Sequence, residues 1–458
     1  MTAPLVSVCI PTRSHGRFLG EALASALDQG IDELEVLVHD DASDDGTADV
    51  VARCGDRRVL HHRHPRPVGV VANRNSCLAR ARGRYIAWLD ADDAYQPGAL
   101  AEQVRLLEEN PGVAVVHGAA EIVDEAGQGR RPWRRPFDHD AVEPGTAAFG
   151  ELILANELTT STVVARAAAH AGAGPFVSSG PSSSDWDMWL RLALEGAVAY
   201  RASTVARYRQ HAGSISAATT AGGARLRCDV RVVRRILRLA ASRLADPRRE
   251  ARRAHAALGA RTLLLAGDLR TRGERAAALR AVALAARLAP GVMRAHSGAL
   301  LAATARADEY ACHRLTRLLL GRLAHQLEGS RFGRSIARAA AGDPEWDAAL
   351  VRVADVLRRV TPPDAMVATA TKWDPTLLHL SGRRGRQFPD RRLLPGGYPR
   401  DGAAAVDHLE QLRRAGLSHL VFPSASRWWL EHYEALAERL GGPAHADEDC
   451  VIFDLRAS

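Results

Sequence analysis

The run Leu89-Asp90-Ala91-Asp92-Asp93 contains the residues of this chain that are best suited to chemistry. It directly follows the apolar stretch Tyr85-Ile86-Ala87-Trp88, which is typical of a buried strand. Divalent cations such as Mg²⁺ and Mn²⁺ prefer oxygen ligands, and two carboxylates one residue apart on a turn can face the same ion. A solvated acidic turn is the alternative interpretation of so short a motif. The first interpretation predicts a metal site at Asp90 and Asp92, where a nucleotide diphosphate would complete the coordination shell.

The elements around this run alternate between strand and helix. Apolar runs predict strands at residues 5–10, 34–38, 59–62 and 85–89, and helical spacing of apolar residues predicts helices at 18–27, 48–53 and 73–82. This alternation is typical of a parallel sheet covered on both faces, and such sheets bind ligands beyond the carboxyl ends of their strands. Three polar segments fall at those ends: Pro11-Thr12-Arg13, Asp40-Asp41 and residues 90–93.

Taken in order, these segments resemble the family 2 glycosyltransferases, which have the GT-A fold. The resemblance covers about residues 4–216 and is carried by Val8-Cys9-Ile10-Pro11-Thr12, residues 40–47, Asn75, Gly83 and residues 89–93. It implies that Pro11, Thr12, Arg13 and Asp41 bind the donor nucleotide, with Asp41 accepting a hydrogen bond from a uracil ring. It also implies that Asp90, Asp92 and Asp93 form the Asp-x-Asp region that meets the metal and the diphosphate, with Asp92 as the first candidate. For the acidic residues after the second strand, a polar β-turn with helix capping is the alternative.

A second acidic segment, Ser184-Asp185-Trp186-Asp187, resembles the helix start that carries the general base in this family, where Glu-Asp-x-Asp is usual. Inverting transfer needs one carboxylate to take the proton of the acceptor hydroxyl, and the resemblance assigns this role to Asp185. Ser184 stands in place of the leading Glu, which changes the electrostatic surroundings of the base. The alternative is that Asp185 only caps its helix. Asp187 faces another direction and is expected to be structural or to contact the acceptor.

Two further segments extend the resemblance. Residues 159–164 resemble the short strand beneath the sugar site. Residues 208–216, which include Arg209 and His211, resemble the closing Tyr-Arg-x-His-x-x-Ser-x-Ser segment. The resemblance implies that Arg209 and His211 lie near the donor diphosphate and that His211 is a further candidate metal ligand. A histidine that simply satisfies the core or the surface is the alternative.

Composition limits the remaining possibilities. Hydrophobic residues make up 47% of the 458-residue chain and charged residues 25%, which is typical of a globular protein with two to four domains. The chain has no stretch of 18 or more uncharged apolar residues and no basic segment before the first strand, so we expect no membrane span and no signal peptide. Its six cysteines are scattered without a C-x-x-C pair, which predicts a reduced cytoplasmic protein without a zinc site.

The net charge of +8 is concentrated between Arg225 and Arg253, where eleven arginines stand against three acidic residues. The apolar residues of this segment recur at helical spacing, so it could lie on anionic lipid at the inner face of a membrane or hold an acidic glycan. A basic helix face in solvent, packed on a helical neighbour, is the alternative. We expect no nucleic-acid partner.

The predicted fold class is α/β. Residues 1–220 are expected to form the GT-A domain, residues 221–343 an α-helical region, and residues 344–458 a small α/β domain of unknown role. The last of these is expected to have strands at 367–369, 420–423 and 450–453.

The sequence therefore predicts a bacterial, inverting glycosyltransferase that depends on Mg²⁺ or Mn²⁺. It would move a sugar from a nucleotide donor, with UDP expected, to a hydroxyl of a glycan, lipid-linked or other acceptor in the synthesis of cell-envelope polysaccharide. Two alternatives stay open. A nucleotidyltransferase would need a Gly-rich loop bearing Lys or Arg after the first strand, and residues 11–16 supply it poorly. A sugar-binding or scaffold protein derived from a transferase is favoured by Ser184 and by the unexplained C-terminal half.

Overall fold

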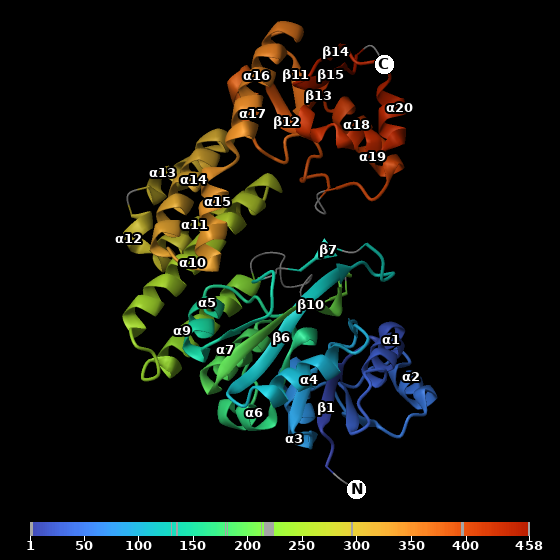
Figure 1. The fold of residues 1–458 in the computed structure, drawn as a ribbon. Coiled ribbons are helices and arrows are strands. Elements are labelled where there is room, and N and C mark those ends of the chain that lie inside the picture. Colours follow the sequence, from blue (N-terminus) through green and yellow to red (C-terminus); the bar gives the residue numbers. More distant parts are fainter. Residues whose placement is uncertain are drawn as a thin grey trace. The chain divides into compact units, whose positions relative to one another are not determined.

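The chain separates into two compact units, Met1–Ala254 and His255–Ser458 (Figure 1). The computed structural model describes residues 3–129, 131–133, 136–178, 180, 182–211, 213–214, 224–294, 296–394 and 398–456, with the backbone alone at 131. The predicted border between residues 220 and 221 lies outside these ranges, and the division into three domains stays a prediction.

The first unit is built on one mixed sheet. Its strands are β1 (Val6–Thr12), β2 (Leu34–Asp40), β3 (Val59–Arg63), β4 (Tyr85–Trp88), β5 (Ala94–Tyr95), β6 (Val113–Val123), β7 (Arg131–Pro132), β8 (Ala141–Glu143), β9 (Val164–Arg166) and β10 (Ala197–Arg209). Within the described residues they follow the order β3-β2-β1-β4-β9-β6-β10-β5, with β7 paired to β6 and β8 to β10. The strands β3, β2, β1 and β4 are parallel, whereas β9 runs antiparallel to both of its neighbours. The parallel half therefore has the predicted order of strand and helix.

The helices of this unit connect the strands and cover them (Figure 1). They are α1 (Gly16–Leu27), α2 (Thr47–Cys54), α3 (Val70–Arg80), α4 (Ala99–Glu109), α5 (Gly145–Leu152), the 3₁₀ helix η1 (Thr160–Thr162), α6 (Ala167–Ala173), α7 (Ser184–Glu195) and α9 (Ala224–Ala240), while α10 (Pro247–Thr271) contains the boundary between the units. Every residue of β2 is buried, as expected for a central strand covered on both faces. The core of the unit gathers apolar residues of β1, β2 and β4 with the inner face of α1, including Leu19 and Leu23.

One predicted element is wrong in detail. The segment 159–164 was expected as a strand, but the structure forms η1 there and starts β9 only at Val164. Hydroxyl side chains can bind nearby backbone groups and so compete with strand pairing. Here Thr162 Oγ1 donates to the carbonyl oxygen of Thr159 at 2.8 Å, which fits the turn.

The second unit contains helices followed by a small sheet. Its helices are α11 (Arg275–Leu288), α12 (Pro290–Met293), α13 (Ser297–Arg306), α14 (Glu309–Gln326), α15 (Arg331–Ala341), α16 (Pro344–Val360), α17 (Thr376–Ser381), α18 (Gly402–Arg414), η3 (Ser424–Ser426), α19 (Trp428–His432) and α20 (Glu434–Leu440). Its strands are β11 (Met366–Thr369), β12 (Arg384–Gln387), β13 (His419–Pro423), β14 (His445–Ala446) and β15 (Cys450–Asp454), in the order β12-β11-β13-β15-β14. The predicted α/β fold class, with a helical region and a small second sheet, is confirmed.

Local sequence explains where several helices of this unit begin. The residues before α14, α15, α16 and α18 each accept a hydrogen bond from a backbone N–H of the first turn, which stabilises a helix start. These caps are Asp308, Ser330, Asp343 and Asp401. Within the described ranges, none of the helices combines the length and apolar character that crossing a membrane requires.

Candidate active site

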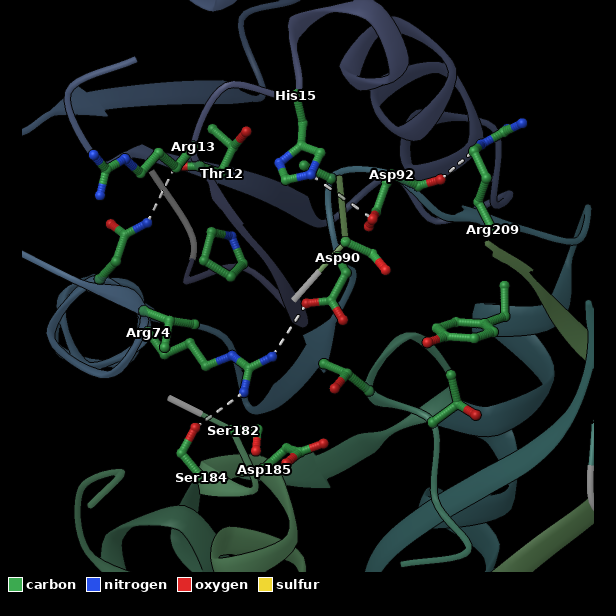
Figure 2. Close-up of a pocket in the computed structure, with 18 of the residues that line it drawn as sticks. Thr12, Arg13, His15, Arg74, Asp90, Asp92, Ser182, Ser184, Asp185 and Arg209 are labelled. Carbon is green, nitrogen blue, oxygen red and sulfur yellow. Dashed lines mark hydrogen bonds and ion pairs between the residues drawn. The ribbon is translucent and has the colours of Figure 1, made fainter. Parts of the chain in front are cut away.

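A cavity of about 450 Å³ opens at the carboxyl ends of β1, β2 and β4 (Figure 2). Its lining brings together all the predicted site residues except His211, which lies behind it against Asp92. The predicted residues in the lining are Pro11, Thr12, Arg13, Asp41, Asp90, Asp92, Asp185 and Arg209. Residues from five separate parts of the first unit thus face one space.

Asp41 lies at one end of this cavity and is almost fully buried. Its carboxylate accepts hydrogen bonds from the backbone N–H groups of Val68, at 2.5 Å, and Gly69, at 3.0 Å. Gly69 has a φ of +86°, where a side chain would be strained, and it directly precedes α3. Asp41 therefore holds the loop before α3 against the cavity. A carboxylate offers about four acceptor positions, so it keeps capacity for a ligand.

Thr12 and Arg13 complete this end of the cavity. The hydroxyl of Thr12 is buried and has no hydrogen-bond partner among the described residues. A buried hydroxyl without a partner is unfavourable unless a ligand or water satisfies it. Arg13 lies at the mouth, with a side chain that is 57% exposed and a guanidinium 4.0 Å from Asp41. Contact of these residues with a nucleotide stays a prediction.

Asp92 is surrounded by two imidazoles. His211 Nε2 lies 3.0 Å from Asp92 Oδ2, and His15 Nε2 lies 3.9 Å from the same oxygen. The candidate ligand atoms of the three residues lie within 4.8 Å of one another. The His211 side chain is only 1% exposed and its Nδ1 has no partner within the described part of the chain. One carboxylate with two imidazoles fits Mn²⁺ or a later transition metal better than Mg²⁺.

Asp90 lies apart from this group. Its Oδ1 accepts a hydrogen bond from Arg74 Nη2 at 3.2 Å, and Arg74 Nη1 also donates to Ser184 Oγ at 3.4 Å, so the guanidinium bridges the two residues (Figure 2). Burial raises the pKa of Asp90, and the charges of Asp92 and Asp185 act in the same direction, against the opposing charge of Arg74. A role for Asp90 in metal binding stays a prediction.

Asp93 and Arg209 shape the turn that carries Asp92. The buried Asp93 carboxylate accepts from Ser161 Oγ at 2.5 Å and from the Arg209 backbone N–H at 2.8 Å. Burial raises the pKa of Asp93 well above its usual range. Arg209 Nε donates to the Asp92 carbonyl at 2.9 Å, and Arg209 Nη2 donates to Glu21 Oε2 at 2.5 Å. These contacts position Asp92, while the predicted contact of Arg209 with the donor stays a prediction.

Asp185 lies in the first turn of α7 and lines the cavity. Asn156 Nδ2 donates to its Oδ2 at 3.4 Å. The residue at the N-cap position is Ser183, and no side chain caps this helix. Asp187 differs sharply, because it is fully buried and pairs with Arg191, at 2.9 Å, and Arg235, at 2.6 Å. Asp187 is therefore structural, whereas Asp185 faces the space where a substrate would lie.

His15 and Arg74 are the site residues that sequence reasoning missed. His15 follows β1 in the loop already singled out at residues 11–16, and that position was the only signal for it. Arg74 is on α3, and its pairing with Asp90 and Ser184 depends on how β4 and α7 are arranged in the fold. No local pattern in the sequence marks it.

Comparison with known proteins identifies the family that part of the first unit matches. The family model described as glycosyl transferase family 2 matches residues 7–160, and the resemblance predicted from the motifs is confirmed. These residues form a family 2 glycosyl transferase domain.

Individual relatives match less than half of this chain. An uncharacterized glycosyltransferase of Rickettsia felis is 27% identical over 213 residues, which are 45% of this chain and 34% of the relative. The Escherichia coli UDP-Glc:alpha-D-GlcNAc-diphosphoundecaprenol beta-1,3-glucosyltransferase WfaP is 27% identical over 217 residues, 46% of this chain and 80% of the relative. Among solved structures, Staphylococcus aureus TarS 1–349 in complex with UDP-GlcNAc has a TM-score of 0.48 and 19% identity, covering 69% of this chain and 91% of that one. The chain thus spans only about a third of the length of the Rickettsia relative.

Proposed function

We propose that the protein is an inverting, metal-dependent glycosyltransferase that transfers a sugar from a UDP-sugar to an acceptor hydroxyl. The observation that carries the proposal is that one cavity is lined by Asp92, which two imidazoles approach, and by Asp185, and that residues of the matched segment 7–160 form much of that cavity. UDP is the favoured nucleotide because the relative WfaP is named for UDP-Glc.

Asp92, His15 and His211 would hold the divalent ion. They fit it because the three ligand atoms converge and because a ring that binds through Nε2 carries its proton on Nδ1, and no contact of Nδ1 in the described residues requires the other tautomer. The ion supplies positive charge that stabilises the departing diphosphate. The backbone at Asp92 is held by Arg209, so the carboxylate stays directed at one place during turnover.

Asp185 would act as the general base. As the acceptor oxygen forms its bond to the anomeric carbon, the bond from that carbon to the diphosphate oxygen breaks, and the hydroxyl proton moves to Asp185. The nucleoside diphosphate leaves with the bonding electrons. Asn156 orients the carboxylate by its hydrogen bond to Oδ2.

The Asp185→Asn variant tests this role. We expect it to bind UDP with Mn²⁺ as the wild type does and to transfer sugar about 10²–10⁴-fold more slowly, because a positioned base contributes on that order. Calorimetry of UDP and of GDP, each with and without Mn²⁺, measures binding, and release of UDP from a panel of UDP-sugars measures turnover. Wild-type transfer by Asp185→Asn would refute the assignment. UDP binding by the wild type without any turnover would favour the scaffold alternative.

For the acceptor we propose a lipid-linked glycan of the cell envelope, since WfaP is named for a diphosphoundecaprenol-linked sugar. A lipid-linked substrate requires the enzyme to work at a membrane surface. The exposed arginines of α9 recur every three or four residues, as one helix face does, and they are Arg227, Arg231, Arg234 and Arg238. Leu239 beside them is 44% exposed. Basic helices of this kind attract anionic lipid.

Reversing the charge of Arg234 and Arg238 to Glu is expected to weaken binding to phosphatidylglycerol vesicles at least tenfold, because each arginine near such a surface contributes about 1 kcal/mol. Co-sedimentation at low and high salt measures it. The Arg53→Glu/Arg57→Glu variant changes the net charge equally at two exposed arginines elsewhere in the first unit and should retain binding. Equal loss in both double variants would argue for a non-specific effect of charge.

A further inference from the structure

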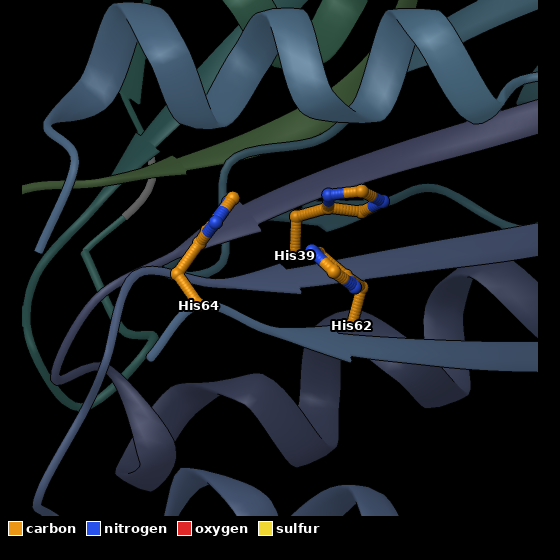
Figure 3. A group of neighbouring side chains, drawn as sticks. All are labelled: His39, His62 and His64. Carbon is orange, nitrogen blue, oxygen red and sulfur yellow. The ribbon is translucent and has the colours of Figure 1, made fainter. Parts of the chain in front are cut away.

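A group of three histidines, His39, His62 and His64, lies on the β2–β3 pair (Figure 3). His39 and His62 are direct partners in the parallel register of these strands. Side chains alternate between the two faces of a strand, so His64 returns to the face of His62 while His61 points away from it. The ring centroid of His62 lies 5.0 Å from that of His39 and 4.9 Å from that of His64. Strand register therefore pairs His39 with His62, and the residue just past the end of β3 adds His64.

The three rings are able to act as ligands. Each offers a ring nitrogen, and these atoms lie within 4.8 Å of one another. His39 is only 1% exposed, and its Nδ1 has no hydrogen-bond partner in the described ranges, which is unfavourable for a buried polar atom.

Asn73 determines which nitrogen of His64 is available. Asn73 Nδ2 donates to the His39 carbonyl oxygen at 2.8 Å, so its Oδ1 is the atom that faces His64 Nε2, at 3.1 Å. An amide oxygen can only accept, and His64 therefore carries its proton on Nε2 and leaves Nδ1 bare. Metal-bound histidines commonly donate their second ring N–H to a carbonyl group in this way.

We propose that His39, His62 and His64 bind a transition-metal ion of the Zn²⁺, Co²⁺ or Ni²⁺ class, at a site separate from the one at Asp92. Three nitrogen ligands leave a fourth position for water in a tetrahedral shell. Metal–nitrogen distances of about 2.0–2.1 Å place such ligands about 3.3 Å apart, so the rings must close in slightly. The half-buried His62 and His64 can turn toward the buried His39. The Arg80 charge opposes a cation here and limits the affinity.

This site was not expected from the sequence. The cysteine spacing predicts no zinc site, and the run His61-His62-Arg63-His64 by itself carries no expectation of metal binding. Its meaning depends on His39, more than twenty residues earlier, and so on the pairing of β2 with β3.

Co²⁺ titration of the full-length protein without a histidine tag tests the proposal. We would use a background with Asp92→Asn, which removes the candidate site at Asp92, and His445→Asn, which removes the further group of potential ligands His445, Asp447 and Cys450. One equivalent of Co²⁺ should bind with the visible absorption of tetrahedral coordination, and Zn²⁺ should displace it. His62→Asn and His64→Asn are each expected to weaken Co²⁺ binding at least tenfold. His61→Asn is the matched control, because it removes the adjacent imidazole on the opposite face and should leave binding unchanged.

Circular dichroism checks that each variant is folded, and the thermal shift caused by Zn²⁺ gives an independent measurement. Zn²⁺ should raise the unfolding temperature of the protein with Asp92→Asn and His445→Asn and of its His61→Asn derivative, but not that of its His62→Asn derivative. The proposal is overturned if Co²⁺ binds equally to all variants, or if it does not bind to the parent protein. The three rings would then be an aromatic cluster alone.

Discussion

Asp92 and Asp93 are neighbours in the chain, but their carboxylates have different surroundings. Asp93 is enclosed by hydrogen bonds from Ser161 and from the backbone of Arg209. Asp92 instead directs its side chain toward His15 and His211. The two residues therefore have different roles: Asp93 fixes the turn, and the Asp92 carboxylate is available to a ligand.

The candidate metal site at Asp92 leads to a prediction for His15, which no sequence motif marks. His15→Asn should weaken the Mn²⁺-dependent binding of UDP by about 10–100-fold. At metal sites, loss of one residue that only supports a ligand already has an effect of this size. Binding of UDP measured with a chelator present should not change. Calorimetry with and without Mn²⁺ makes the comparison, and Asp92→Asn should produce a loss at least as large. Unaltered Mn²⁺ dependence in His15→Asn would remove this histidine from the site.

Residue types and order were sufficient to name residues that the fold brings to one cavity. Pro11, Thr12, Asp41, Asp92 and Asp185 all line it, while their roles stay predictions. The contacts between them could not be predicted, because each depends on packing between distant segments. His211 and Asp92 are 119 residues apart in the chain, and Arg74 reaches Ser184 across 110.

At the scale of the elements, the parallel half of the sheet was predictable because its strands are strongly apolar and end at polar residues. The 159–164 segment was not, because its threonines and serine have the β-branched or small side chains of a strand but use their hydroxyls for local and site contacts. Ser161 Oγ donates to Asp93, and the Asp90 backbone N–H donates to Ser161 Oγ, so the turn supports the acidic run.

The connection between α3 and β4 depends on a close approach of two backbone segments. A Cβ at Gly83 would lie 2.4 Å from the backbone nitrogen of Ser7 on β1. Gly83→Ala is therefore expected to destabilise the protein by about 1–3 kcal/mol, as overpacking generally does. Urea unfolding measures the change. Gly112→Ala is the control, because a Cβ there meets no atom within 4 Å, and a similar loss in both variants would contradict the steric explanation.

At the scale of the whole molecule, the family match covers residues 7–160, and the second unit lies beyond it.

The first unit also contains a histidine that links the stability of the fold to pH. His170 is buried and accepts a hydrogen bond from Trp88 Nε1 at 3.2 Å. Burial lowers the pKa of His170 to about 3.

Between about pH 6.5 and 3 the unfolded chain binds a proton at His170 that the folded chain does not. The free energy of unfolding must then fall as the pH falls, by about 1.4 kcal/mol per pH unit for this residue. His170→Gln keeps an acceptor for Trp88 and removes the titration. With a chelator present, urea unfolding at pH 7 and pH 5 should show a smaller loss of stability in the variant than in the wild type. An equal loss would mean that His170 does not contribute.

Because β3 lies at the end of the sheet, a metal ion bound by the histidine group would hold an edge strand in place. A strand with one neighbour is the first to fray, and its unpaired edge can recruit another chain. An ion shared by His39 and His62 would tie this outermost strand to β2, which is buried along its whole length. The loop that leaves β3 contains Gly69, one of the two residues whose backbone N–H groups Asp41 holds against the cavity. Occupancy of the proposed histidine site would then determine how long the entrance to the cavity keeps its shape under heat or denaturant.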